Sequence, residues 1–229
     1  MKRKIFYIIF ALAVITFSSC SKDDSTDTRI TYYPTITLTG DSYLSWNKGE
    51  TFVDPGYKCV LNGEDVTNKV TVNTNMDVNT KGLYKVSYSF TNPDGFSSTL
   101  VRNVCVVDKN EAVEGLYYVD PTLSNRSGTA YSSFGKDMYI EVYKDGDKYK
   151  VTDLIGGFYD QGRAYGSDFA MSGHVEVAAD GTMSLLDSEI PGFGGDVTTF
   201  SGKFDSASHT ISMQVVWSDM TFNVSLIKK

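Results

Sequence analysis

The stretch HTISMQVVWSDMTFNVSLI, residues 209–227, decides the fold class of the C-terminal half of the chain. Apolar and polar residues alternate along both halves of the stretch, and this period of two is typical of a β-strand with one buried face. The residues expected to face inward are Ile211, Met213, Val215, Trp217, Phe222, Val224 and Leu226. The pattern therefore predicts two neighbouring strands that share one apolar side.

Similar segments precede this pair back to residue 115. They read LYYV, DMYIEVY, KYKVTDLI, SGHVEVAA, TMSLLDS and TTFSGKFD, and Asp-Gly pairs at residues 145–146 and 180–181 predict hairpin turns. Eight consecutive strands with no helical stretch predict an up-and-down antiparallel domain over residues 113–229. Closure into a lipocalin-like β-barrel would remove the exposed sheet edges, and a flatter sandwich is the alternative.

Residues 34–108 form a second β-rich region. In LYKVSYSF, residues 83–90, the side chains of Tyr84, Val86, Tyr88 and Phe90 share one face of a strand. About seven short strands separated by turn signals such as NPDGF predict an immunoglobulin-like sandwich. The whole chain is therefore expected to be all-β, with two domains.

Two stretches of this region resemble a known family. GETFVDPGYKCVLNGEDVTNKV and VNTKGLYKVSYSFTNPDGFSSTLVRNVCVVD are similar to the immunoglobulin-like repeat of bacterial surface proteins. That repeat has an Asp-Pro-Gly turn, a strand with alternating tyrosines and a final strand with an arginine followed by alternating valines. The resemblance implies a spacer or adhesion module without catalysis.

The first residues have the pattern of an export signal. Lys2, Arg3 and Lys4 precede thirteen apolar residues, IFYIIFALAVITF, a run too short for the roughly 20 residues of a membrane-spanning helix. Residues 18–20, Ser-Ser-Cys, resemble a bacterial lipobox, which implies a leader over residues 1–19 and lipidation of Cys20. Residues 20–33 are then a lipidated tether, and the lipid anchor is the expected attachment to the membrane.

The C-terminal half also resembles a family. YKVTDLIGGFYDQGRAYG, residues 149–166, and the final MTFNVSLIKK are similar to the C-terminal domain of Bacteroidetes outer-membrane lipoproteins associated with glycan-uptake systems of the starch-utilisation type. The resemblance implies a carbohydrate context and a transporter complex as partner. In that group, residues like Ser21, Lys22, Asp23 and Asp24 behind the cysteine resemble a signal for export to the cell surface.

The charge of the chain excludes one class of partner. Without the three cations of the leader, 18 Lys and Arg stand against 28 Asp and Glu, a net charge of −10. Such a surface repels phosphate backbones, so nucleic-acid binding is not expected. Cys59 and Cys105 remain for a disulfide, which export permits. The strand pattern places Cys59 inward but makes Val104 and Val106 the buried pair around Cys105, so their pairing stays open.

No pattern in the chain indicates catalysis, a metal or a cofactor. The two histidines, His174 and His209, are 35 residues apart and have no cysteine nearby, so no metal site is expected. Asp153, Asp160 and Asp168 lie in one stretch, but spacing alone does not make a pair of glycosidase carboxylates. Since Asp153 follows Val151 by two residues, its side chain is expected to point inward.

One long connection carries the residue types that recognise sugars. Its aromatic and polar side chains, together with a phenylalanine in the Gly-rich stretch IPGFGGD, give the candidate ligand-binding residues: Asp153, Phe158, Tyr159, Arg163, Tyr165 and Phe193. The other interpretation is that Phe158 and Tyr159 fill one end of the barrel. The sequence predicts a non-catalytic surface lipoprotein that binds a polysaccharide or oligosaccharide. The alternatives are an assembly subunit of the uptake complex and a lipocalin-style carrier of a small apolar ligand.

Overall fold

The computed structural model describes residues 30–229. The predicted leader, the lipidation site at Cys20 and the predicted export signal at residues 21–24 lie outside the described residues. Within residues 30–229, no helix combines the length and the apolar character needed to cross a membrane.

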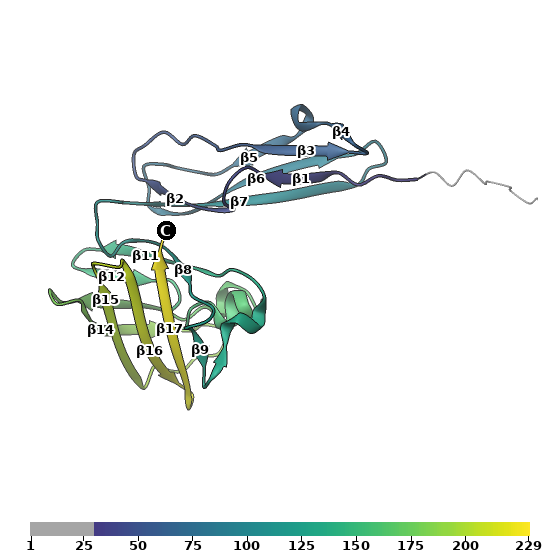
Figure 1. Cartoon of the computed structure of the whole chain (residues 1–229). Helices are drawn as coiled ribbons and strands as arrows, with labels where there is room; N and C mark the ends of the chain where they lie inside the picture. Colours follow the sequence, from purple (N-terminus) through teal and green to yellow (C-terminus); the bar gives the residue numbers. More distant parts are fainter. Residues whose placement is uncertain (1–29) are drawn as a thin grey trace, which may run out of the picture. The chain divides into compact units, whose positions relative to one another are not determined.

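The N-terminal domain is a two-sheet immunoglobulin-like sandwich, as the sequence predicts (Figure 1). One sheet has the order β1-β3-β4, and the other has the order β2-β7-β6-β5, in which β2 and β7 are parallel. The strands are β1 (Thr35–Leu38), β2 (Tyr43–Asn47), β3 (Tyr57–Leu61), β4 (Glu64–Asp65), β5 (Thr71–Thr74), β6 (Gly82–Thr91) and β7 (Ser97–Val107), with the short 3₁₀-helix η2 (Thr67–Lys69) between β4 and β5.

The predicted alternation in β6 is confirmed. Val86 and Tyr88 are buried in the core of the sandwich, while Lys85 on the opposite face of the strand is exposed. The hairpin from β6 to β7 turns at NPDGF, where the Asn92 N–H donates to the Phe96 carbonyl at 2.9 Å and Gly95 has a φ of 85°. A left-handed backbone conformation, with positive φ, at this position favours glycine.

A buried arginine explains two of the motifs of this domain. Arg102, on β7, is fully buried, and its guanidinium donates to Asp54 Oδ1 at 2.5 Å and to the Gly56 carbonyl at 3.0 Å. The other oxygen of Asp54 accepts a hydrogen bond from the hydroxyl of Tyr88. The Asp-Pro-Gly turn thus supplies partners for both terminal nitrogens of the buried guanidinium.

The C-terminal domain is a closed barrel of eight antiparallel strands. Its strands are β8 (Gly115–Val119), β11 (Tyr139–Asp145), β12 (Lys148–Val151), β13 (Ser172–Val177), β14 (Thr182–Glu189), β15 (Thr199–Asp205), β16 (Thr210–Trp217) and β17 (Met220–Lys228). Strands β14 to β17 run side by side in Figure 1. The last strand pairs with the first, with Leu226 opposite Val119 and Ile227 opposite Tyr118. This pairing removes the open edges, so the barrel interpretation is confirmed over the flatter sandwich.

Side chains fill the interior of the barrel. All seven residues that the alternation of residues 209–227 placed inward are buried, Trp217 among them. The packing is tight enough that a Cβ added to Gly156 would lie 2.9 Å from a methyl group of Val224. Each strand therefore contributes alternate side chains to one continuous core.

Short helical turns interrupt the connections, which corrects the expectation of a domain without helical stretches. Gly156 and Gly157 both have a positive φ and lead into the π-helical turn η4 (Phe158–Gly162), in which the Gly162 N–H donates to the Gly157 carbonyl at 2.7 Å. A five-residue turn is too short to show a helical period in the sequence. The remaining short elements are β9 (Asn125–Arg126), β10 (Thr129–Ala130), and the 3₁₀-helices η3 (Tyr131–Phe134) and η5 (Ser167–Phe169).

Cys59 and Cys105 are free and fully buried. Cys59 lies in the core of the sandwich, as its strand position predicts. Val104 and Val106 are buried, as expected, and Cys105 between them is buried as well, because Leu116 and Tyr139 cover the other face of β7 at this point. The two thiols thus belong to different apolar clusters, so no disulfide joins them.

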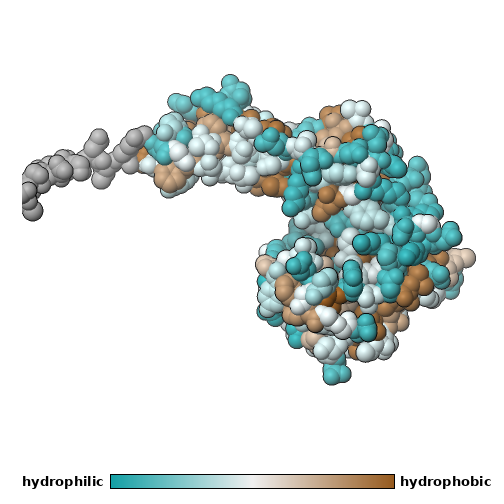
Figure 2. Space-filling view, turned by 180° about the vertical axis from the view of Figure 1, so that it is seen from behind, coloured by the Kyte–Doolittle hydropathy of each residue, from teal (hydrophilic) through white to brown (hydrophobic). Residues whose placement is uncertain are grey.

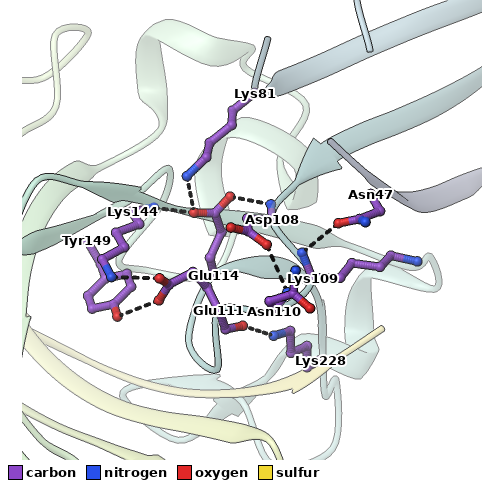
Figure 3. Close-up of polar contacts among 10 residues, drawn as sticks. All are labelled: Asn47, Lys81, Asp108, Lys109, Asn110, Glu111, Glu114, Lys144, Tyr149 and Lys228. Atoms are coloured by element: carbon purple, nitrogen blue, oxygen red, sulfur yellow. Dashed lines mark hydrogen bonds and ion pairs between the residues drawn. The ribbon is translucent and has the colours of Figure 1, made fainter. Parts of the chain in front are cut away.

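The segment that joins the domains, residues 109–113, is followed by a fully buried carboxylate. Glu114 accepts hydrogen bonds from Lys81 Nζ at 2.5 Å, the Asp108 N–H at 2.8 Å and the Lys144 N–H at 2.9 Å (Figure 3). Each oxygen of the carboxylate therefore has a partner, as a buried charge requires. Hydrogen bonds to Glu114 thus fix the chain next to the segment that joins the domains.

Candidate ligand-binding surface

The structure separates the predicted aromatic residues into a buried pair and an exposed pair. Phe158 and Tyr159, both on η4, are 2% and 9% exposed and belong to the barrel core. Tyr165 and Phe193 are 54% and 46% exposed. The interpretation that Phe158 and Tyr159 fill one end of the barrel is therefore the correct one, whereas Tyr165 and Phe193 are exposed to solvent.

The exposed rings of Tyr165 and Phe193 and the half-buried ring of Phe169 form one cluster, here called the aromatic patch. Phe169 lies between the others, with ring centroids 5.4 Å from Tyr165 and 4.7 Å from Phe193. Two core rings support the patch, since Tyr159 is 6.0 Å from Tyr165 and Trp217 is 5.8 Å from Phe193. Aromatic pairs prefer such offset and edge-on arrangements, so the rings hold each other in place.

The Gly-rich loop of residues 190–196 positions Phe193. Ile190 anchors the loop in the core, and its carbonyl accepts a hydrogen bond from the Gly194 N–H at 2.7 Å. The indole N–H of Trp217 donates to the Gly194 carbonyl at 3.2 Å. A Cβ on Gly192 would lie 2.5 Å from the ring of Phe169, so the close approach of loop and ring requires glycine. The loop is therefore held in one conformation.

An open depression of about 540 Å³ adjoins Phe193. Trp217 forms part of its floor, and the polar side chains of Asp196, Thr198 and Ser218 line it. Elsewhere, on the face shown in Figure 2, apolar residues form small groups among hydrophilic ones. An aromatic ring beside hydrogen-bonding groups suits a ligand with one apolar face and several hydroxyl groups.

Arg163 takes part in packing. Its side chain follows η4 and is exposed, and its guanidinium lies over the rings of Phe134 and Phe158 at 5.9 and 5.5 Å. This cation–π arrangement stabilises the covering of the core. The sequence grouped Arg163 with Tyr165 and Phe193. In the structure, the Arg163 guanidinium contacts Phe134 and Phe158, whereas Tyr165 and Phe193 contact each other in the aromatic patch.

Asp153 is buried, as its spacing of two residues from Val151 predicts, although β12 ends at Val151 and Asp153 lies in the connection that follows. Its Oδ1 accepts a hydrogen bond from the Ile155 N–H at 2.9 Å, while Oδ2 has no hydrogen-bond partner in the described part of the chain. Burial raises the pKa of Asp153 to about 8, and the charge of Asp160 adds to the rise, whereas nearby backbone N–H groups oppose it. The side chain is therefore protonated at neutral pH and can donate a hydrogen bond.

Asp153 lies in the wall of a second depression, here called the acidic pocket, of about 310 Å³. The pocket is lined by four carboxylates, from Glu141, Asp153, Asp160 and Glu189, together with Lys150, Thr152, Gln161, Ser167, Ala170, Ser172 and Pro191. Burial raises the pKa of Glu141 and of Asp160. No local pattern marks Glu141, because its neighbours Ile140 and Val142 are buried too and the strand shows no alternation.

The carboxylates do not form a metal centre. Within residues 30–229, no three His, Cys, Asp or Glu side chains are arranged to hold a metal ion. His174 instead makes a hydrogen bond from Nδ1 to the carboxylate of Asp187 at 2.8 Å. The carboxylate oxygens of the acidic pocket therefore surround a space that is larger than a single metal ion occupies.

A crystal structure supplies the decisive comparison. The lipoprotein BT2262 from Bacteroides thetaiotaomicron is 31% identical to this chain, with a TM-score of 0.68, and the match covers 86% of this chain and 100% of that one. The chain belongs to the BT2262-like lipoprotein family. Family models agree: a bacterial surface protein Ig-like domain matches residues 36–106, and a family described as a C-terminal domain matches residues 107–228. The predicted family of surface lipoproteins with an Ig-like domain is therefore confirmed.

Other similarities of this BT2262-like chain are weaker. Two structures of Clostridium perfringens ZmpB, one of the M60 catalytic domain with CBM51 domains and one of CBM51-2 in complex with GlcNAc, are 12% and 15% identical, each with a TM-score of 0.30. The matches cover 87% and 85% of this chain but only 24% and 43% of those chains. Likeness at this level says nothing about function. No curated protein matches the chain.

The BT2262-like barrel differs from a carrier in its interior. A lipocalin-style carrier encloses a ligand cavity, whereas here Tyr117, Met213 and Phe222 belong to a core that fills the barrel from inside. The aromatic patch lies on the connections of this domain, and the acidic pocket is lined by strand and connection residues together. The packed interior therefore does not match a carrier that encloses its ligand.

Proposed function

We infer that this BT2262-like surface lipoprotein is a non-catalytic glycan-binding accessory of an outer-membrane polysaccharide-uptake system. The observation that carries the proposal is the exposure of Tyr165 and Phe193 on a base of buried rings. The apolar C–H face of a sugar ring stacks on an aromatic face, and rings fixed before binding lose little entropy. Asp196 and Thr198 in the adjoining depression supply hydrogen-bond partners for sugar hydroxyls.

The proposal includes the position of the protein in the cell. A lipid on Cys20 would anchor it in the outer membrane, and residues 21–24 would direct it to the outer face. Protease treatment of intact cells tests this placement. Digestion of the protein is expected, and full protection would contradict the surface location.

Calorimetry of the full chain in detergent against a panel of polysaccharides tests glycan binding. Binding of at least one polysaccharide is expected, and Tyr165→Ala or Phe193→Ala should weaken it by about tenfold or more, which corresponds to a loss of about 1.4 kcal/mol of binding free energy. Phe96→Ala is the matched control, because Phe96 is 43% exposed in the other domain. No heat with any polysaccharide would contradict the proposal.

An assembly subunit is the second candidate, because exposed aromatic residues also serve protein interfaces. Affinity purification of the native complex separates the two functions. If glycan binding is absent and the Tyr165→Ala protein no longer retains its partners, the patch is a protein interface. If glycan binding depends on Tyr165 and the complex is unchanged, the patch serves the ligand.

A further inference from the structure

The acidic pocket holds four carboxylates without an ion pair. In the described part of the chain, Glu141, Asp153, Asp160 and Glu189 have no basic group within ion-pair distance, although Lys150 also lines the pocket. Two acidic residues elsewhere in the protein each form an ion pair with a basic side chain. Glu114, which is fully buried, has Lys81 at 2.5 Å, and Asp54 has Arg102 at 2.5 Å. The pocket thus gathers acidic groups for which the described part of the chain supplies no ion-pair partner.

Asp153 adds a second and independent observation. Its carboxyl group is buried and contributes to the pocket wall, yet Oδ2 has no hydrogen-bond partner within residues 30–229. A buried polar atom without a partner costs free energy, and in native proteins such atoms are rare. A ligand that donates a hydrogen bond to Oδ2 would remove this cost.

The arrangement of the oxygens indicates the size of that ligand. Since no three acidic side chains in the described residues converge on a metal position, a bare cation does not fit the pocket. The volume of about 310 Å³ is at the lower end of the range for small-molecule sites. The Ser167 hydroxyl in the lining offers a partner for a further polar group of an organic molecule, whereas the Thr152 hydroxyl and the Gln161 amide already bond to Glu141 and to the Tyr139 backbone.

We propose that the acidic pocket binds a small organic cation through a primary ammonium group, as in an amino sugar, with the ammonium donating to Asp153 Oδ2 and facing the carboxylates of Glu141 and Asp160. The three N–H bonds of an ammonium suit several carboxylate oxygens at once. The pocket and the aromatic patch share no lining residue. The inference is therefore independent of glycan binding at the patch.

Three sugars of the same ring test this site in the full chain. Calorimetry at about pH 6.5 compares glucosamine, whose amine is then largely protonated, with glucose and N-acetylglucosamine, which are neutral. Glucosamine is expected to bind about tenfold or more tightly than either neutral sugar, and added salt should weaken it. Equal affinity for the three sugars, or no binding of glucosamine, would overturn the proposal.

Substitutions identify the pocket as the site. Asp153→Asn keeps the size of the side chain but cannot ionise next to a bound ammonium, so glucosamine affinity should fall about tenfold or more. Asp147→Asn, in the exposed hairpin between β11 and β12, is the matched control and should bind as the unmodified protein does. If Asp153→Asn fails to fold, Glu141→Gln serves in its place, because an amide oxygen can still accept the hydrogen bond from Thr152. Unchanged affinity in the folded variant would contradict the site.

Proton release gives a readout that a merely structural role would not produce. An ammonium next to Asp153 favours the ionised carboxylate, so binding at about pH 7 should release a proton from the protein. Calorimetry in buffers with different ionisation enthalpies measures this release, which Asp153→Asn should abolish. Polysaccharide binding that depends on Tyr165 should remain in that variant, so a failure of this inference is distinguishable from a failure of the proposed function.

Discussion

Replacing Asp153 by asparagine should change how the stability of the barrel depends on pH. Burial raises the pKa of Asp153 to about 8, whereas an aspartate in an unfolded chain has a pKa of about 3.9. Between about pH 4 and pH 8 the folded protein therefore holds a proton that the unfolded chain has released. Because the native state binds more protons, the free energy of unfolding falls as the pH rises through this window.

One proton corresponds to a slope of about 1.4 kcal/mol per pH unit. The Asp153→Asn protein lacks this proton, so the stability of the variant relative to the unmodified protein should rise by about 3 kcal/mol between about pH 5 and pH 7. Burial raises the pKa of Glu141 and Asp160 as well, but both residues remain in the two proteins and their effects largely cancel in the difference.

Urea unfolding at several pH values measures this difference. The chain has two tryptophans, so a Trp46→Phe background leaves Trp217, in the barrel core, as the fluorescent reporter of this domain. Asp147→Asn is the control, and its stability should follow that of the background protein at every pH. A difference between the Asp153→Asn protein and its background that stays constant from about pH 5 to pH 7 would show that native Asp153 is ionised, and would refute the reasoning.

Three further predictions follow from the packing. Asp54→Ala leaves the buried Arg102 guanidinium without its carboxylate, so the free energy of unfolding should fall by about 3–5 kcal/mol. Urea unfolding followed by Trp46 fluorescence in a Trp217→Phe background measures this loss. A loss no larger than that of the exposed Glu64→Ala variant would contradict the prediction. Gly192→Ala places a Cβ 2.5 Å from the ring of Phe169, and we expect a stability loss of about 1–3 kcal/mol with weaker polysaccharide binding, whereas an unchanged melting temperature and affinity would count against a fixed loop. Burial raises the pKa of Cys105 to about 12, so Cys59 and Cys105 should react with a thiol reagent only after denaturation; rapid labelling of Cys105 in the native protein would disprove its burial.

Much of the fold could be predicted because strands leave a local signal. Alternation in residues 209–227 identified the inward side chains of β16 and β17, and the eight predicted strand segments of the C-terminal half correspond to the eight barrel strands. The family motifs of the first domain are short local patterns in the sequence, although the hydrogen bonds between the Asp-Pro-Gly turn and Arg102 join residues far apart in the chain. The alternation of Tyr149, Val151 and Asp153 likewise predicted that the side chain of Asp153 points inward.

The candidate site depended on contacts that no local pattern contains. Phe158 and Tyr165 lie in one connection and look alike in the sequence, but the π-helical turn η4 buries the first and leaves the second exposed. Phe193 joins Tyr165 only because another connection brings it within 6.4 Å. Glu141 and Glu189 reach the acidic pocket from β11 and β14, strands that are far apart in the chain.

The sequence by itself determined the fold class, the order of strands and the faces they bury, because a period of two depends only on neighbouring residues. The tertiary structure alone decided that β17 closes on β8, that Cys105 is covered from its second face, and that four carboxylates share one pocket. These features arise between residues far apart in the chain. They depend on how the barrel closes and on what its connections cover, and a local hydrophobic pattern carries no information about either.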